Sequence, residues 1–185
     1  MIIRPAQNES ELSEILTLQT ANLGSSLSDQ LKQNQGFVTV KHRLEDLQAL
    51  HSKAPQIIAH DGNRVVGYAL VMDPSCRDLL PILFPLFESL DALEWKGQPV
   101  KDLNYYVMGQ ICVDQAYRRQ GLFGALYDGH QQLLSNQYRC CLTEVSSDNT
   151  PSLKAHKKQG FETLKIYDGP QDRWHILCWD WPESF

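Results

Sequence analysis

The stretch that decides the fold is residues 110–124, which read QICVDQAYRRQGLFG. It begins inside an apolar run rich in Tyr, Val and Ile, residues 104–113, which predicts a β-strand. After a polar turn, Leu122 opens a segment whose apolar residues follow helical spacing. The first backbone amides of a helix have no partner within it and lie at the positive end of its dipole. This strand–turn–helix therefore predicts an anion site beside Gly121 and Gly124.

Two arginines, Arg118 and Arg119, add positive charge to this turn in a chain whose 17 Lys+Arg and 22 Asp+Glu give a formal net charge of −5. The anion that we expect is a phosphate. The sequence has neither the P-loop G-x-x-x-x-G-K-[S/T] nor a dinucleotide G-x-G-x-x-G after its first strand, which disfavours nucleoside triphosphates and nicotinamide cofactors. A bland alternative stays open here, in which the two glycines only let the helix pack on its sheet.

Composition excludes several classes of protein. The chain has no long Lys/Arg run, which argues against a nucleic-acid partner. Its longest apolar stretch, Leu79–Phe87, is broken by Pro81 and Pro85 and is far shorter than the roughly 20 residues that span a bilayer. The N-terminus has no hydrophobic targeting core, so we expect a cytoplasmic protein with no membrane association.

The cysteines fit a reducing compartment, because their number is odd and none has C-x-x-C spacing. We expect buried free thiols at Cys76, Cys112, Cys140, Cys141 and Cys178. The 185 residues, 42% of them hydrophobic, suit a single domain over residues 1–185. The histidines show no metal-ligand spacing with cysteines or carboxylates, so no metal is expected.

Outward from residues 110–124, the pattern alternates strands with helices and describes a mixed α/β sheet. Asn8 and Glu11 have the spacing of a capping box for the first helix. The Ser/Gln-rich residues 24–36 are interpreted as a loop. The strands that we expect are residues 1–4, 56–60, 65–72, 104–113, 140–145, 161–167 and 174–181. The helices that we expect begin at residues 8, 44, 122 and 150, with one more inserted within residues 73–102.

Gly109 lies inside a predicted strand, where glycine is unfavourable and often marks a bulge. A bulge before Gln110 would splay this strand from its parallel neighbour, residues 140–145, and leave backbone groups free to pair with a ligand. Further along, Thr150 and Pro151 form a helix start. Neither feature decides the function alone.

Together these features resemble the GNAT superfamily of acetyl-CoA-dependent N-acetyltransferases. The most specific part is the pattern R/Q-x-x-G-x-G/A, which begins at Arg118 and departs from the family only at Phe123, with the glycine displaced to Gly124. The resemblance implies an α+β fold: a twisted, mostly antiparallel sheet of about six to seven strands with flanking helices. It also implies a splayed central parallel pair, interrupted in sequence by the helical insertion at residues 73–102.

By that resemblance, acetyl-CoA is the acyl-donor substrate. The backbone of residues 111–113 would pair with its pantetheine arm, the amides of residues 119–124 would hold its pyrophosphate, and Asn149 would bond to the arm. An N–H at the bulge would stabilise negative charge on the thioester carbonyl. The full set of implied donor-binding residues is Ile111, Cys112, Val113, Arg118, Arg119, Gln120, Gly121, Leu122, Phe123, Gly124, Asn149, Ser152 and His156.

Catalytic groups are less marked in the sequence. Many family members place a tyrosine as general acid four residues before a Gly-Phe pair, and here that position is His156, which could equally pack beside the donor without transferring a proton. Glu144 is the candidate base, although it could also face outward from its strand. Tyr105, Tyr106 and Gln110 are candidates for the acceptor pocket, and the two tyrosines could instead be core residues.

Two functions follow from this resemblance. The first is transfer of an acetyl group from acetyl-CoA to a primary amine of a small molecule or peptide, directly within a ternary complex. The second is a catalytically silent CoA or acyl-CoA sensor, or an interaction module, of the same fold. The family also tends toward homodimers. The insertion at residues 73–102 is interpreted either as a lid over the acceptor or as a structural cap.

Overall fold

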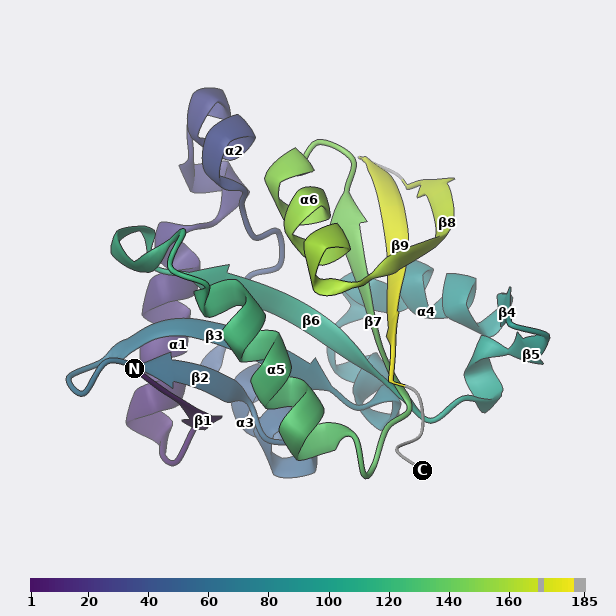
Figure 1. The fold of residues 1–185 in the computed structure, drawn as a ribbon, viewed down its shortest axis with the longest axis horizontal. Helices are drawn as coiled ribbons and strands as arrows, with labels where there is room; N and C mark the ends of the chain where they lie inside the picture. Colours follow the sequence, from purple (N-terminus) through teal and green to yellow (C-terminus); the bar gives the residue numbers. More distant parts are fainter. Residues whose placement is uncertain (170–171, 182–185) are drawn as a thin grey trace.

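A computed structural model describes residues 1–169 and 172–181; residues 170, 171 and 182–185, which the predicted single domain includes, lie outside the described part. Within it, seven strands form one sheet in the order β1-β2-β3-β6-β7-β9-β8 (Figure 1). Neighbouring strands are antiparallel except for the central pair, β6 and β7. The predicted fold class is confirmed. The strands are β1 Ile2–Pro5, β2 Ile57–His60, β3 Val65–Met72, β6 Tyr105–Val113, β7 Cys140–Ser146, β8 Glu162–Asp168 and β9 Arg173–Asp180.

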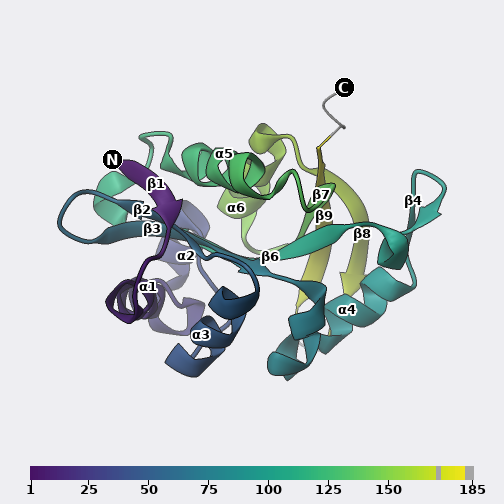
Figure 2. The same ribbon diagram turned by 90° about the horizontal axis from the view of Figure 1, so that it is seen from below.

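Helices cover both faces of the sheet. Helices α5 (Leu122–Leu134) and α6 (Thr150–Gln159) lie on one face, whereas α1 (Glu9–Ala21) and α3 (Leu44–Lys53) lie on the other (Figure 2). Each face buries its own apolar cluster, because the fully buried strand β3 offers side chains to both. The sheet is thus the middle of three layers, and its two cores fix the strand positions around the splay.

Local capping agrees with the sequence in part. The Asn8 side chain accepts a hydrogen bond from the Glu11 amide at 3.0 Å, as expected for the start of α1. The Glu11 carboxylate, however, binds Arg4 and the Gln7 amide rather than the Asn8 amide. Only one of the two hydrogen bonds of the predicted capping box is therefore formed, because the ion pair with Arg4 of β1 holds the Glu11 carboxylate away from the Asn8 amide.

The central strands separate where the sequence predicts. Strands β6 and β7 pair only over Tyr105–Val107 and 140–142, and beyond that they diverge toward α6 (Figure 1). Leu70 of β3 pairs with Gln110 and the next residue with Met108, so Gly109 has no partner and forms the expected bulge. The splay thus begins at the bulge, and β6 carries on from it without a neighbour on its β7 side.

Residues 24–36, predicted to be a loop, contain a 3₁₀ turn at Gly24–Ser26 and the helix α2 at Asp29–Gln35. Ser28 caps α2, and Gly36 ends it with a left-handed φ of 73°. The loop prediction was wrong because α2 buries none of its residues and so has no apolar periodicity to reveal it.

The insertion is helical but broken. Instead of one helix it holds several short elements. Three of them have a proline at their first or second position, where a proline is tolerated in a helix. Leu86, Phe87 and Leu90 anchor it in the core, whereas Ile82 is 62% exposed. The elements are η2 Pro74–Leu79, η3 Pro81–Leu83, α4 Phe84–Asp91, β4 Glu94–Trp95, β5 Gln98–Pro99 and η4 Val100–Asp102.

The five cysteines are all buried and free, as predicted. Over residues 1–169 and 172–181, no helix has both the length and the apolar character needed to cross a bilayer. In the same residues, no three His, Cys, Asp or Glu side chains lie close enough to hold a metal ion.

Candidate functional site

The turn between β6 and α5 exposes a run of backbone amides. After the 3₁₀ turn η5 (Gln115–Tyr117), Arg119 and Gly121 have left-handed φ values of 62° and 82°. The first backbone hydrogen bond of α5 runs from the Ala125 amide to the Gly121 carbonyl at 3.1 Å. The amides of residues 122–124 therefore have no acceptor within the helix, which is the backbone arrangement that the predicted anion site requires.

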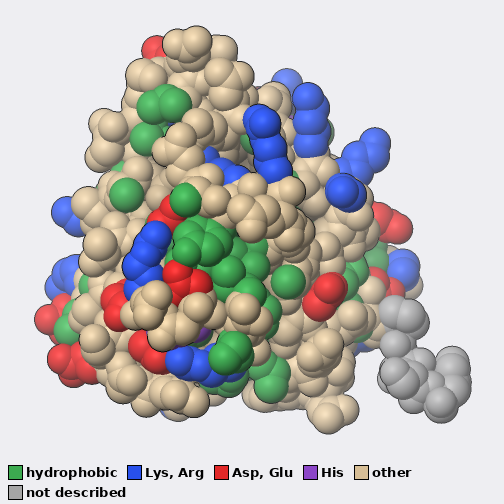
Figure 3. All heavy atoms as spheres, turned by 60° about the vertical axis from the view of Figure 1, so that its left-hand side comes forward, with side chains coloured by type: hydrophobic (Ala, Val, Ile, Leu, Met, Phe, Trp, Pro, Cys, Tyr) green, Lys and Arg blue, Asp and Glu red, His purple; other side chains and the backbone are tan. Residues whose placement is uncertain are grey.

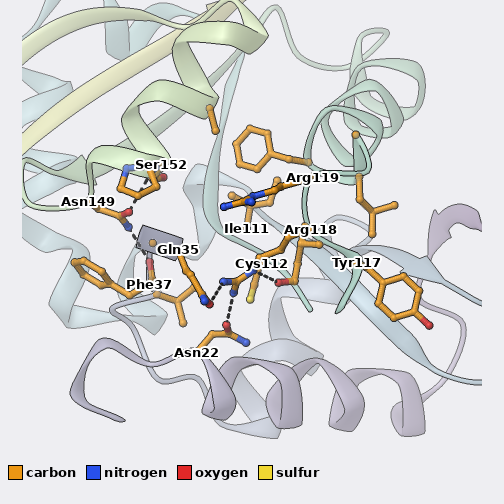
Figure 4. Close-up of a pocket in the computed structure, with 18 residues that line it drawn as sticks. Asn22, Gln35, Phe37, Ile111, Cys112, Tyr117, Arg118, Arg119, Asn149 and Ser152 are labelled. Atoms are coloured by element: carbon orange, nitrogen blue, oxygen red, sulfur yellow. Dashed lines mark hydrogen bonds between the residues drawn. The ribbon is translucent and has the colours of Figure 1, made fainter. Parts of the chain in front are cut away.

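A cavity of about 230 Å³, the donor cavity, opens beside this turn (Figure 4). Strand β6, the turn itself, the start of α6 and the segment that follows α2 each supply part of its wall. Ten of the predicted donor-binding residues line it: Ile111, Cys112, Val113, Arg118, Arg119, Gly121, Leu122, Phe123, Asn149 and Ser152. The structure therefore brings most of the predicted donor-binding residues together around one cavity.

Three members of the predicted set lie outside this wall: Gln120, Gly124 and His156, which borders the second cavity described below. The Gln120 side chain folds back to the Ala116 carbonyl at 3.1 Å. Gly124 faces α6, where a Cβ would lie 3.2 Å from the Gln159 side-chain oxygen. The displaced glycine therefore allows α5 and α6 to approach each other closely, which is a packing role toward α6 and not toward the sheet, as the alternative had it.

Arg118 and Arg119 have different roles. The Arg118 guanidinium donates to the Asn22 side chain at 2.5 Å and the Gln35 side chain at 2.7 Å, while its Nε donates to the Val113 carbonyl at 3.0 Å (Figure 4). Arg118 thus joins three elements and also lines the donor cavity, and its predicted place beside phosphate charge stays a prediction. Arg119 is exposed, makes no hydrogen bond within the described residues, and projects toward α6 (Figure 4).

A segment after α2, residues 35–40, crosses the site, and we call it the strap. The Asn149 side chain donates to the Phe37 carbonyl at 2.8 Å and accepts from the Ser152 amide at 3.3 Å. Gln110 donates to the Val40 carbonyl at 2.8 Å. The side-chain amides of Asn149 and Gln110, which were predicted to contact the pantetheine arm and the acceptor, thus hold the strap. The sequence did not predict the strap, because its contacts join residues that are far apart in the chain.

Gln110 is itself fixed from behind. Its Oε1 accepts from the Tyr68 hydroxyl at 2.6 Å and from the Gln19 amide at 2.8 Å, and the Gln19 amide also lies 2.8 Å from His42 Nδ1. These groups are all buried. A buried network with satisfied partners is rigid, so the strap is held on a fixed support directly after the bulge.

A second cavity of about 300 Å³ lies next to the first, and we call it the acceptor cavity because Gln110, a residue predicted for the acceptor pocket, lines it. Thr143 and Glu144 of β7 and Gly109 of β6 form its floor, and Tyr167 and Trp174 of the last two strands contribute to its wall. The insertion adds Ile82, Leu83 and Pro85. The two cavities share Phe37, Val38, Ile111, Asn149 and Ser152. A molecule lying along β6 would pass from one into the other.

Glu144 presents a partly buried carboxyl group to the acceptor cavity. Burial raises its pKa, and a hydrogen bond from the Tyr167 hydroxyl to Oε2 at 2.6 Å lowers it in part. Its other oxygen, Oε1, accepts no hydrogen bond from the described residues. A carboxylate with a raised pKa in a cavity is a candidate proton acceptor, and the alternative that Glu144 faces solvent does not match this position.

His156 also borders the acceptor cavity, but both of its ring nitrogens are engaged. Nδ1 lies 2.8 Å from the Ser152 carbonyl, which can only accept, so Nδ1 carries the proton and Nε2 accepts from the Tyr127 hydroxyl at 2.7 Å. The ring stacks edge-on against Phe123 and Phe161. Burial lowers its pKa to about 4. His156 is therefore neutral and packs beside the site, rather than holding a labile proton.

Burial affects two other histidines in the same way. Each has its pKa lowered to about 4, because a charged imidazole would lose its hydration inside the protein. The three buried histidines are His42, His130 and His156.

Tyr105 and Tyr106 lie upstream of the splay and line neither cavity. Both are buried, and the Tyr106 hydroxyl is 2.8 Å from His130 Nδ1. Their predicted place in the acceptor pocket is corrected to core packing, because β6 is still paired with β7 at this point. Gln110 does line the acceptor cavity.

The surface around the donor cavity carries positive charge. Lys154, Lys157 and Lys158 are exposed on α6, the helix whose first turns line the cavity, and the last two lie in its final turn. Figure 3 shows Lys and Arg side chains gathered at the upper right of one face and acidic side chains mostly at its lower left. Such separation creates a local field that favours an anionic ligand despite the negative net charge.

Comparison with known proteins identifies the arrangement. The family model described as "Acetyltransferase (GNAT) family" matches residues 28–161. The Ard1 structure from Thermoplasma volcanium superposes with a TM-score of 0.66 at 16% identity, over 98% of each chain. No curated protein matched the chain.

Two further solved structures share the fold. The ribosomal-protein-S18-alanine N-acetyltransferase from Escherichia coli gives a TM-score of 0.65 at 12% identity, over 100% of this chain and 96% of that one. The putative acetyltransferase yncA from Salmonella typhimurium, solved with acetyl-CoA, gives 0.64 at 16% identity over the same shares. At these identities the solved structures show the fold alone. Membership of the family is shown by the family model, which matches more than half of the sequence. The chain belongs to the GNAT family of acetyltransferases.

Proposed function

We propose that the chain is an N-acetyltransferase that moves the acetyl group of acetyl-CoA to a primary amine by direct transfer within a ternary complex. The observation that carries the proposal is the junction of two cavities at the splay. One cavity opens on unpaired helix amides, and the other holds the Glu144 carboxyl group. Their common wall at Ile111 gives the donor and the acceptor one place to meet.

The donor side supports binding through the backbone. The amides of residues 119–124 and the Arg119 side chain would hold the pyrophosphate. Residues 111–113 line the donor cavity on the part of β6 that β7 no longer pairs. Backbone groups that point away from β3 there, apart from the Val113 carbonyl that Arg118 holds, are free for the amides of the pantetheine arm. This arm would lead the thioester toward Gly109 and the acceptor cavity.

The acceptor side supports proton removal. An ammonium entering beside Glu144 would give it one proton, because the raised pKa of this buried carboxyl makes it a stronger base than an exposed one. The neutral amine then attacks the thioester carbonyl, so that the C–N bond forms and the C–S bond breaks. The second amine proton leaves with the thiolate as CoA thiol. Amides near the bulge at Gly109 would stabilise the oxyanion.

A second function, a silent CoA or acyl-CoA sensor, is favoured by one observation. His156 stands where many family members have a tyrosine acid, and its only N–H is committed to the Ser152 carbonyl. A domain with no proton donor at this place could bind the donor and not turn it over.

Thiol release separates the two functions. The protein is incubated with acetyl-CoA and a panel of primary amines while free thiol is followed, and CoA binding is measured by calorimetry. Amine-dependent thiol release that is lost in Glu144→Gln, with CoA affinity unchanged, supports transfer. Tight CoA binding without release on a broad panel would support the sensor instead.

A further inference from the structure

The acceptor cavity has an uneven chemical character. Among the described residues that line it, one is an acidic side chain, Glu144, and none is Lys or Arg. His156 adds no charge, since its lowered pKa keeps it neutral. The remaining wall carries no charge. Its neutral polar members are Thr39, Gln110, Thr143, Ser146, Asn149, Ser152 and Tyr167. Its apolar members are Phe37, Val38, Val40, Ile82, Leu83, Pro85, Met108, Ile111, Val145 and Trp174.

From this lining we propose that the acceptor is a small monoamine with an apolar, preferably aromatic, body and no carboxylate. The inference rests on the proposed function, because it assigns a substrate class to the same site. It goes beyond that function, which requires only a primary amine and sets no limit on the rest of the molecule.

The cationic end of such a molecule has one partner. Glu144 Oε1 accepts no hydrogen bond from the described residues, while Oε2 is held by Tyr167. An ammonium at Oε1 would satisfy the buried carboxylate and be satisfied by it. A charge removed from water is tolerated when it is paired in this way. A single free oxygen thus selects a single cationic group.

The apolar wall rejects further charges. The carboxylate of an amino acid lies next to its amine, so it would enter the same low-dielectric space as Glu144 with no cation to meet it. Two like charges a few ångströms apart in a protein environment repel strongly. A diamine or polyamine has the opposite problem, because its second ammonium would lie against side chains such as Val40 and Trp174 with no acid to pair with.

The insertion shapes this selectivity from the rim. Leu83 is buried, whereas Ile82 lines the cavity and is also 62% exposed. A side chain with both properties lies at the mouth. Phe84 is exposed to 41% in the same insertion, but it does not line the cavity. These two positions offer a matched test of charge at the mouth with little risk to folding.

Binding of matched amines to the CoA-loaded protein tests the proposal by calorimetry. We expect phenethylamine and phenylalanine amide to bind with similar affinity and phenylalanine to bind about 100-fold more weakly, since only its carboxylate repels Glu144. Hexylamine should bind at least about 10-fold more tightly than 1,6-diaminohexane. Equal binding of phenylalanine and its amide, or tighter binding of the diamine, would overturn the proposal.

Variants place the selectivity in this cavity. In Ile82→Arg, the preference for phenethylamine over phenylalanine should fall by about 5-fold, as for one exposed ion pair. The same preference should be unchanged in Phe84→Arg. An unchanged preference in Ile82→Arg, or an equal fall in both variants, would overturn the assignment to this mouth.

The outcomes also separate this inference from the proposed function. Selective binding of monoamines without thiol release would support the substrate class and count against transfer. Thiol release with polyamines or free amino acids would support transfer and overturn the class. A short peptide amide that binds more tightly than every small monoamine would likewise overturn it.

Discussion

Replacing Gly121 by glutamate tests the anion site at the start of α5 directly. We expect Gly121→Glu to lose CoA binding while remaining folded. The substitution has two separable effects, one on backbone conformation and one on charge, and the structure allows each to be given a magnitude.

The conformational effect follows from φ. Gly121 has a φ of 82°, and a Cβ built there meets no atom within 4 Å. The cost is therefore the left-handed backbone alone, about 1–2 kcal/mol for an L-residue. For a chain of this length each kcal/mol lowers the unfolding midpoint by about 2–4 °C, so the midpoint should fall by about 2–8 °C.

The charge effect is larger for binding. A carboxylate about 4 Å from a phosphate repels it by roughly 1–4 kcal/mol between water and a protein surface, and a pyrophosphate presents two such charges. CoA affinity should thus fall at least about 100-fold in Gly121→Glu. In Gly121→Ala, which adds no charge, the fall should be far smaller.

The Gly62→Glu variant is the matched control. Gly62 lies in the turn between β2 and β3 with a φ of 109°, and its Cβ also meets nothing within 4 Å. It should lose similar stability and keep its CoA affinity. Calorimetric titration with CoA, together with thermal melts, measures both quantities. Wild-type affinity in a folded Gly121→Glu protein would refute the location of the phosphate site.

Three further predictions follow from the site. Arg118→Met should lower the unfolding midpoint because it removes three hydrogen bonds. Arg119→Met should leave the midpoint unchanged and weaken CoA binding. Thermal melts and calorimetry measure both effects, and the reverse pattern would contradict the two assigned roles. Glu144→Gln should lower kcat by about 10²–10⁴-fold. Because burial raises the pKa of Glu144, the midpoint of the fall in kcat at acidic pH should lie above pH 4.5. Tyr167→Phe removes a hydrogen bond that lowers this pKa, so it should move the midpoint to higher pH. A midpoint that does not move in this variant would exclude Glu144 as the base. The three buried histidines have folded pKa values of about 4 against about 6.5 when unfolded, so the unfolded chain binds more protons between these values. The free energy of unfolding should be highest above pH 6.5 and should fall toward pH 4, by roughly 1–3 kcal/mol for each histidine. An unfolding midpoint that does not change with pH over this range would contradict the burial of these histidines as neutral groups.

The sequence predicted the features that depend on local backbone chemistry. Gly109 inside a strand predicted the bulge, and Gly121 before an apolar helix predicted the turn, because both positions need conformations or space that other residues tolerate poorly. The mixed sheet followed from the periodicity of strands and helices. These signals lie within a few residues of the feature that they determine.

Features that depend on distant contacts could not be predicted in this way. The roles of Arg118, Asn149 and Gln110 were assigned to ligands, yet their side chains hold the strap, over separations of up to 112 residues in the sequence. The strap begins at the last residue of α2, a helix that buries none of its residues and so gives no periodic signal. The residues next to each hydrogen-bonding partner in the sequence carry no pattern that predicts the contact.

The structure also explains how the site tolerates its departure from the family pattern. The donors at the start of α5 are backbone amides, so the side chain at Phe123 does not decide whether they exist. The sequence must supply Gly121 for the left-handed turn and Gly124 for the approach of Gln159 on α6. With these two met, Phe123 is free to line the donor cavity and to pack on His156. Its replacement by glycine should therefore weaken the packing of α5 on α6 more than it changes the phosphate site, because it removes an aromatic contact and no amide.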